Sequence, residues 1–190
     1  MGRNVACIDL ALTNTGWVVA DLFGKETIVE VGIIKTPPAS AKQAKSRKQT
    51  VGELDWARSQ KLATELKKLL TEHAVQHVYV ECPTGGAKSS RAAKSMALAK
   101  GAASAVCAGL GLTATLFTPQ QAKKAATGSN NATKSEVKNA ALKEFSYYDG
   151  WVRNSKGALV KGVNEHIFDA CSVLMCARRT SSYKELNTNV

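Results

Sequence analysis

Three carboxylates in this chain occupy positions that suit metal ligands. Asp9 and Glu81 each end a short apolar run, and Asp169 lies on an apolar stretch near the C-terminus, three residues after His166. Divalent cations that act on phosphate groups are held by carboxylates that converge from different elements. These residues therefore predict metal-dependent chemistry on a substrate that contains phosphate.

A long basic segment separates the second carboxylate from the next acidic residue. Between Glu81 and Glu136 the sequence has no acidic residue, and the formal net charge of the 190-residue chain is +11. The basic residues of this segment are Lys88, Arg91, Lys94, Lys100, Lys123, Lys124 and Lys134. Because the positive charge is clustered, it indicates a nucleic acid partner rather than only a solvated basic surface.

The elements that must position these residues follow from the hydrophobic pattern. Apolar runs bounded by turn residues predict strands over residues 4–10, 17–20, 27–34, 77–81 and 112–117. Helical periodicity and Pro119 predict helices over residues 54–74, 90–108, 119–126, 132–145 and 164–179. We read residues 13–16 as a turn and residues 36–52 and 148–163 as loops. This order predicts an α/β fold with a mixed five-stranded sheet and helices on both faces, forming one domain over residues 1–180 and a flexible polar tail over 181–190.

The predicted topology allows the candidate ligands to meet. A long helix between the first and fourth strands can return the fourth strand parallel to the first, which would bring Asp9 next to Glu81. His166 and Asp169 share one face of the last helix because they are three residues apart. Glu165 is the competitor of His166, and it faces about 100° away.

The cysteines and the hydropathy pattern bear on the compartment. Five cysteines in apolar surroundings, with no CxxC pair, are typical of reduced core residues. No apolar stretch is long enough to span a bilayer, so we expect no membrane association. We expect a cytoplasmic protein, in the host cell cytoplasm if the source is viral.

Four stretches, in order, carry a resemblance to a known family. They are residues 8–17 (IDLALTNTGW), 78–81 (VYVE), 118–137 with the basic motif TPQQAKKAATG, and 166–172 (HIFDACS). The chain resembles the RuvC-like Holliday junction resolvases of the RNase H-like (retroviral integrase) superfamily, whose members include phage-type proteins. The family fold agrees with the predicted order of strands and helices.

The resemblance implies an activity and a set of site residues. By it, Asp9, Glu81, His166 and Asp169 are catalytic ligands of two Mg²⁺ ions, with Mn²⁺ as a substitute, and His166 stands where many relatives have Asp. Lys123 and Lys134 fall on basic positions that contact phosphate, and Lys134 joins the catalytic set. The protein would be a homodimer that cuts four-way DNA junctions at two symmetric sites. The residues expected to bind DNA are Lys88, Arg91, Lys123, Lys124 and Lys134.

Several alternatives remain at this stage. Residues 82–86 (CPTGG) carry no aromatic side chain, whereas bacterial relatives often insert one into the junction there. This departure favours, as an alternative, a broader nuclease for flaps and forks. A DNA-binding protein without catalysis on the same fold is a third reading. An actin-like or sugar-kinase-type ATPase shares the early Asp-turn-Thr-Gly pattern but needs a longer chain. No dimer interface can be named from the sequence, although the apolar stripe of the first long helix is the first place to look.

Overall fold

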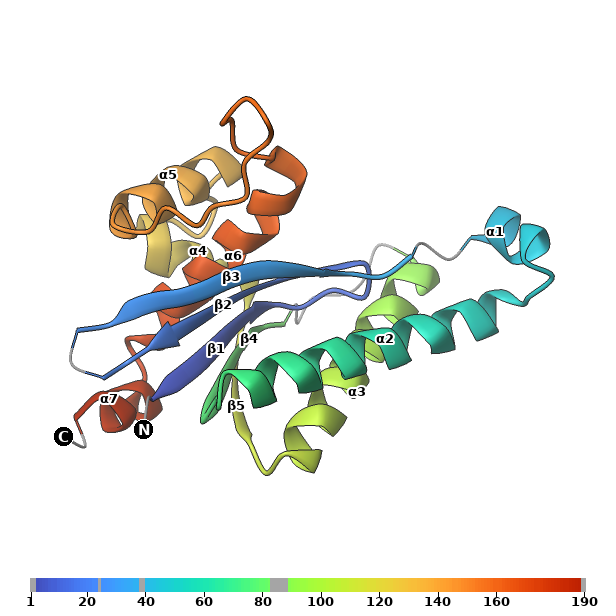
Figure 1. Cartoon of the computed structure of the whole chain (residues 1–190), viewed down its shortest axis with the longest axis horizontal. Coiled ribbons are helices and arrows are strands. Elements are labelled where there is room, and N and C mark those ends of the chain that lie inside the picture. The colour runs from blue at the N-terminus through green and yellow to red at the C-terminus, as the bar shows by residue number, and fades with distance from the viewer. Residues whose placement is uncertain (1–2, 24, 38–39, 83–88, 189–190) are drawn as a thin grey trace.

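A twisted five-stranded sheet forms the centre of the computed structural model, which describes residues 3–23, 25–37, 40–82 and 89–188 (Figure 1). The strand order is β3-β2-β1-β4-β5. The strands are β1 (Asn4–Asp9), β2 (Asn14–Asp21), β3 (Thr27–Lys35), β4 (His77–Glu81) and β5 (Thr113–Phe117). The first three strands form an antiparallel meander, and β4 and β5 run parallel to β1, so the predicted mixed sheet is confirmed.

Helices cover both faces of this sheet (Figure 1). One face carries α2 (Val51–Glu72) and α3 (Ser90–Gly109). The other carries α4 (Pro119–Thr127), α5 (Lys134–Glu144) and α6 (Lys161–Ala177). The side chains of β1 alternate between the two layers: Val5 and Cys7 join the core under α6, whereas Ala6 and Ile8 join the core under α2 and α3. Both faces of β1 are therefore dry, and its terminal Asp9 lies where this core ends.

Two segments that we expected to be irregular are helical. The expected loop over residues 36–52 contains α1 (Ala41–Ser46), which begins with a capping box between Ser40 and Gln43. The expected flexible tail contains α7 (Ser181–Thr188). The Tyr183 side chain is buried in the core that the sheet forms with α6, and Arg3 donates a 3.0 Å hydrogen bond to the Leu186 carbonyl. These contacts attach the C-terminal residues to the start of β1, so the reading of residues 181–188 as a loose tail is wrong.

The apolar stripe of α2 belongs to the core of its own chain. Leu62, Leu66, Leu69 and Leu70 are buried against the sheet, whereas Trp56 of the same helix is 68% exposed. The leucines are therefore unavailable to a second copy of the chain. Five free cysteines are buried, as expected for reduced core residues. Within the described residues no helix combines the length and the apolarity that a membrane crossing requires.

Candidate active site

The register of the sheet places two of the predicted ligands side by side. Asp9 is the last residue of β1 and is the direct partner of Glu81, the last residue of the parallel strand β4. The carboxyl ends of parallel strands share one edge of a sheet, and ligands of α/β proteins collect at such edges. The predicted neighbourhood of Asp9 and Glu81 is therefore confirmed.

Helix α6 brings the remaining ligands to the same edge. Ligand atoms of Asp9, His166 and Asp169 all lie within 4.8 Å of one another. Nδ1 of His166 is 2.9 Å from Oδ2 of Asp9, a distance at which the imidazole N–H donates to the carboxylate. Among the described residues this is the group of acids and histidine that is close enough to share a cation. Glu81 lies beside the group rather than within it.

A glycine makes the approach of α6 possible. Gly16 pairs with Asp9 across β1 and β2, and a Cβ built on it would lie 2.1 Å from the carbonyl oxygen of His166. The backbone of α6 thus rests on a position of β2 that has no side chain. We expected residues 13–16 to be a turn, but β2 already begins at Asn14, so Gly16 belongs to the strand.

Burial and mutual repulsion disfavour the ionised form of the carboxylates in this cluster, and a nearby positive charge would favour it. Burial raises the pKa of Glu81 to about 8, and the charges of Asp9 and Asp169 act in the same direction. Burial, followed by the charge of Asp9, raises the pKa of Asp169 to about 6, while Lys134, His166 and Lys123 oppose the rise. A divalent cation would relieve this repulsion and favour the ionised carboxylates. The donor set of three carboxylates and one imidazole therefore fits a divalent metal.

Glu165 does not complete this cluster. Its carboxylate forms an ion pair with the ammonium group of Lys134, at the start of α5. The imidazole of His166, rather than the carboxylate of Glu165, lies beside Asp9.

The predicted DNA-binding residues differ in their positions relative to the acidic cluster. The charges of Lys123 and Lys134 reach the acidic cluster, since they lower the pKa of Asp169. Lys124 is exposed in the last turn of α4, and the described residues show no ion pair for it. Lys88 lies outside the described residues. Arg91 instead contacts a carboxylate of α2.

A buried carboxylate that we did not single out from the sequence holds Arg91. Asp55 on α2 is 2% exposed and accepts hydrogen bonds from both terminal nitrogens of Arg91, one of them at 2.7 Å. Lys94 lies 3.3 Å from Asp55, and Arg58 lies 3.5 Å from it. Arg58 also donates to the hydroxyl of Thr13, in the connection that follows Asp9. The guanidinium of Arg91 therefore joins α3 to α2 instead of standing free for DNA.

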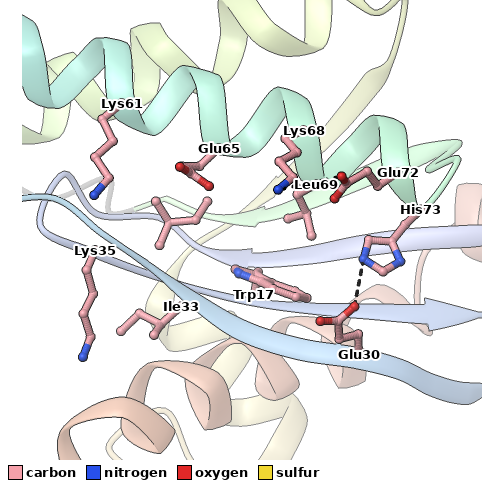
Figure 2. Close-up of a pocket in the computed structure, with 11 residues that line it drawn as sticks. Trp17, Glu30, Ile33, Lys35, Lys61, Glu65, Lys68, Leu69, Glu72 and His73 are labelled. Atoms are coloured by element: carbon pink, nitrogen blue, oxygen red, sulfur yellow. Dashed lines mark ion pairs between the residues drawn. The ribbon is translucent and has the colours of Figure 1, made fainter.

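A hollow without excess charge lies on the face of the sheet that α2 covers (Figure 2). It encloses about 420 Å³ between α2 and the β2–β3 hairpin, with Trp17 at its floor. An ion pair of 3.2 Å joins His73 to Glu30 across it. Its charged side chains balance, with lysines at 35, 61 and 68 and glutamates at 30, 65 and 72. This hollow therefore suits a polyanion poorly.

Comparison with solved structures supports the fold. The chain is similar to Thermus thermophilus RuvC in complex with a Holliday junction substrate, with 20% identity, 92% of each chain covered and a TM-score of 0.68. A second structure of Thermus thermophilus RuvC gives 20% identity, 92% and 93% coverage and a TM-score of 0.66. The yeast mitochondrial Holliday junction resolvase Ydc2 gives 11% identity, 96% and 84% coverage and a TM-score of 0.57. A comparison with curated protein sequences gave no match.

The family of the chain follows from its own sequence. The model of the family described as crossover junction endodeoxyribonuclease RuvC matches residues 5–144, well over half of the chain. The match includes Asp9, Glu81, Lys123 and Lys134, and it ends before α6. The chain therefore belongs to the RuvC family of crossover junction endodeoxyribonucleases.

Proposed function

We propose that this protein resolves four-way DNA junctions by metal-dependent hydrolysis of phosphodiester bonds. The observation that carries the proposal is the convergence of Asp9, His166 and Asp169 within 4.8 Å, beside Glu81, in a chain of the RuvC family. A cluster of ionisable groups that repel one another is costly to maintain in a fold without a use for it. Metal binding gives this cluster such a use.

Asp9, Glu81, His166 and Asp169 are the proposed ligands of two Mg²⁺ ions, with Mn²⁺ as a substitute. When bound, the ions would supply an activated water and charge stabilisation at the phosphate. The protein contributes the placement of the ligands: Asp9 and Glu81 are fixed by the register of the sheet, and His166 and Asp169 by the contact of α6 with Gly16. Ligands fixed in this way lose little conformational freedom when a cation binds.

The lysines next to the cluster are proposed to hold the cleaved strand. Lys123 and Lys134 lie near enough to Asp169 to lower its pKa, so each can also stabilise negative charge at a phosphate there. Lys134 is the one we include in the catalytic set. Lys124, and Lys88 beyond the described residues, are proposed to bind the DNA backbone farther from the cut. For Arg91 a DNA contact stays a prediction that competes with its bonds to Asp55.

A homodimer is part of this proposal. A four-way junction has two strands to be cut at symmetric positions, and a two-fold dimer presents two equivalent active sites to them. Only with both cuts does the junction separate into duplexes.

Cleavage of matched DNA substrates tests the proposed function. We would compare a four-way junction, a flap and a linear duplex of the same arm sequences, with Mg²⁺ or Mn²⁺, for the wild type and Asp9→Asn. Preferred cleavage of the junction that is lost in Asp9→Asn supports a resolvase. Equal rates on junction and flap would favour a broader branched-DNA nuclease, in line with the absence of an aromatic residue at 82–86. Tight junction binding without cleavage in either metal would contradict the proposed catalysis.

A further inference from the structure

A basic hollow lies next to the acidic cluster, between α5 and the first half of α6. It encloses about 390 Å³ and reaches Asp169 at one end. Its polar lining comes from the two helices: Lys134, Ser135 and Lys138 on α5, and Lys161, Asn164, Glu165 and Asp169 on α6. The hollow thus continues directly from the proposed metal site.

Helical spacing arranges the charges of this hollow in two facing rows. On α5, Lys134 and Lys138 are one turn apart and share a face. On α6, Lys161, Glu165 and Asp169 recur every four residues and share a face as well. Three ammonium groups and two carboxylates therefore line the hollow. The carboxylate of Asp169 belongs to the proposed metal site, and the carboxylate of Glu165 does not.

The partners of the three lysines differ. Lys134 forms an ion pair with Glu165, whereas Lys138 and Lys161 form none within the described part of the chain. Carboxylate and phosphodiester oxygens are both acceptor-only anionic groups, so an ammonium group can exchange one for the other. The Glu165 carboxylate thus stands where a phosphate oxygen would be expected to bind.

The dimensions of the hollow suit a strand that already passes the metal cluster. From Lys161 to Asp169, α6 advances by about 12 Å, at 1.5 Å per residue. Successive phosphates of one strand advance by about 3.4 Å along a duplex. Lys161 is therefore within reach of a phosphate that lies up to about four nucleotides from the phosphate at the cluster.

We propose that this hollow is a second anion site, which binds a backbone phosphate of the cleaved strand, and that Glu165 occupies it in the free protein. The inference rests on the proposed function, since it needs DNA at the acidic edge. Lys138 and Lys161 would hold the second phosphate. Lys134 would leave Glu165 and turn to the DNA when the strand arrives. The ion pair to be broken has a mostly exposed lysine, so the exchange costs little.

The test of the lysines measures binding without cleavage. Affinity for a four-way junction is followed by fluorescence anisotropy without divalent cations, over a range of KCl concentrations. The change Lys138→Ala with Lys161→Ala should make the slope of log affinity against log salt less steep by about 0.9, the value for one lost phosphate contact. The control changes are Lys143→Ala with Lys184→Ala, which remove the same charge from exposed lysines outside the hollow. Thermal melting of each variant checks that the fold is intact.

The test of Glu165 uses a variant with the opposite effect. Glu165→Gln should strengthen junction binding by up to about fivefold, because Lys134 no longer has to leave a carboxylate. In the Glu165→Gln background, Lys134→Ala should weaken binding more than it does in the wild type. Glu185→Gln on α7 makes the same change of net charge at the far end of the sheet and serves as the control.

The outcomes separate this inference from the proposed function. If the wild type shows no salt-dependent junction binding, the proposed function and the inference both fail. If the wild type binds but the Lys138 and Lys161 changes give the slope of their control, the second anion site is wrong. If Glu165→Gln binds no better than Glu185→Gln, Glu165 does not occupy a phosphate position.

Discussion

The contact between Gly16 and α6 gives the sharpest prediction about the geometry of the site. In Gly16→Ala the new methyl group would lie 2.1 Å from the His166 carbonyl oxygen, 2.4 Å from its carbonyl carbon and 2.8 Å from its Cβ. All three distances are shorter than 3.0 Å, and real Cβ atoms essentially never lie that close to another heavy atom. Two of the three contacted atoms belong to the backbone of His166, so rotation of a side chain cannot relieve the clash. The start of α6 must therefore move away from β2.

The size of the effect follows from this displacement. Relief of the clash requires a shift of about 1 Å, and misplacement on that scale costs on the order of 100-fold in rate. The overpacking itself should lower the free energy of unfolding by about 1–3 kcal/mol. The shift separates His166 and Asp169, on α6, from Asp9 and Glu81, on the sheet, so metal affinity should fall as well.

Single-turnover cleavage of a four-way junction, measured together with urea unfolding, tests this reasoning. Gly101→Ala is the matched control, because a Cβ at Gly101 in α3 meets nothing within 4 Å. That control should retain full activity and gain about 0.5–1 kcal/mol of stability, as expected for alanine in a helix. A Gly16→Ala protein with wild-type cleavage and stability would refute the account of how α6 is positioned.

Three further predictions concern charge. Burial raises the pKa of Glu81 to about 8 and the pKa of Asp169 to about 6. The folded protein therefore binds protons at these two carboxyl groups more tightly than the unfolded chain does. Without divalent cations the free energy of unfolding should therefore fall as pH rises from about 4 to 8, and Mg²⁺ should restore it mainly near pH 8. Urea unfolding at each pH measures this dependence, and a free energy of unfolding that does not change with pH would contradict the prediction. Asp55→Asn should lower the free energy of unfolding by about 3 kcal/mol, because Arg58 would stay buried without its carboxylate; wild-type stability in urea would contradict this role. Cleavage should be faster with Mn²⁺ than with Mg²⁺, which prefers oxygen ligands, and His166→Asp should reverse the order; unchanged metal preference in that variant would argue against a liganding imidazole.

The features of the site that depend on strand order could be predicted from the sequence. Apolar runs that end in Asp9 and Glu81 indicate buried strands with a carboxylate at the same edge, and the observed register pairs these two residues directly. The spacing of His166 and Asp169 indicated one helical face, and both side chains reach Asp9. These features can be predicted because the residue period of a strand or helix determines which side chains share a face, whatever the tertiary contacts are.

Other features depend on contacts between distant segments, and the sequence conceals them. Asp55 looks like an ordinary polar residue of α2, and its burial depends on Arg91, 36 residues later in the chain. Gly16 resembles a turn glycine after Asn14, although a glycine within a strand can also indicate close backbone approach. The helix over 41–46 had a local signal, the Ser40 and Gln43 capping box, that we did not use. The helix over 181–188 is stabilised through Tyr183, whose partner Glu26 lies at the other end of the sequence.

Mapping the nicks in an immobile four-way junction tests the central claim most directly. Each of the four strands is labelled in turn and incubated with Mg²⁺ and the wild-type protein or Asp9→Asn. The account predicts paired nicks at symmetric positions in two opposing strands, leaving 5′ phosphates, and none with Asp9→Asn. Nicks scattered over all four strands, or the same nicks with Asp9→Asn, would contradict it.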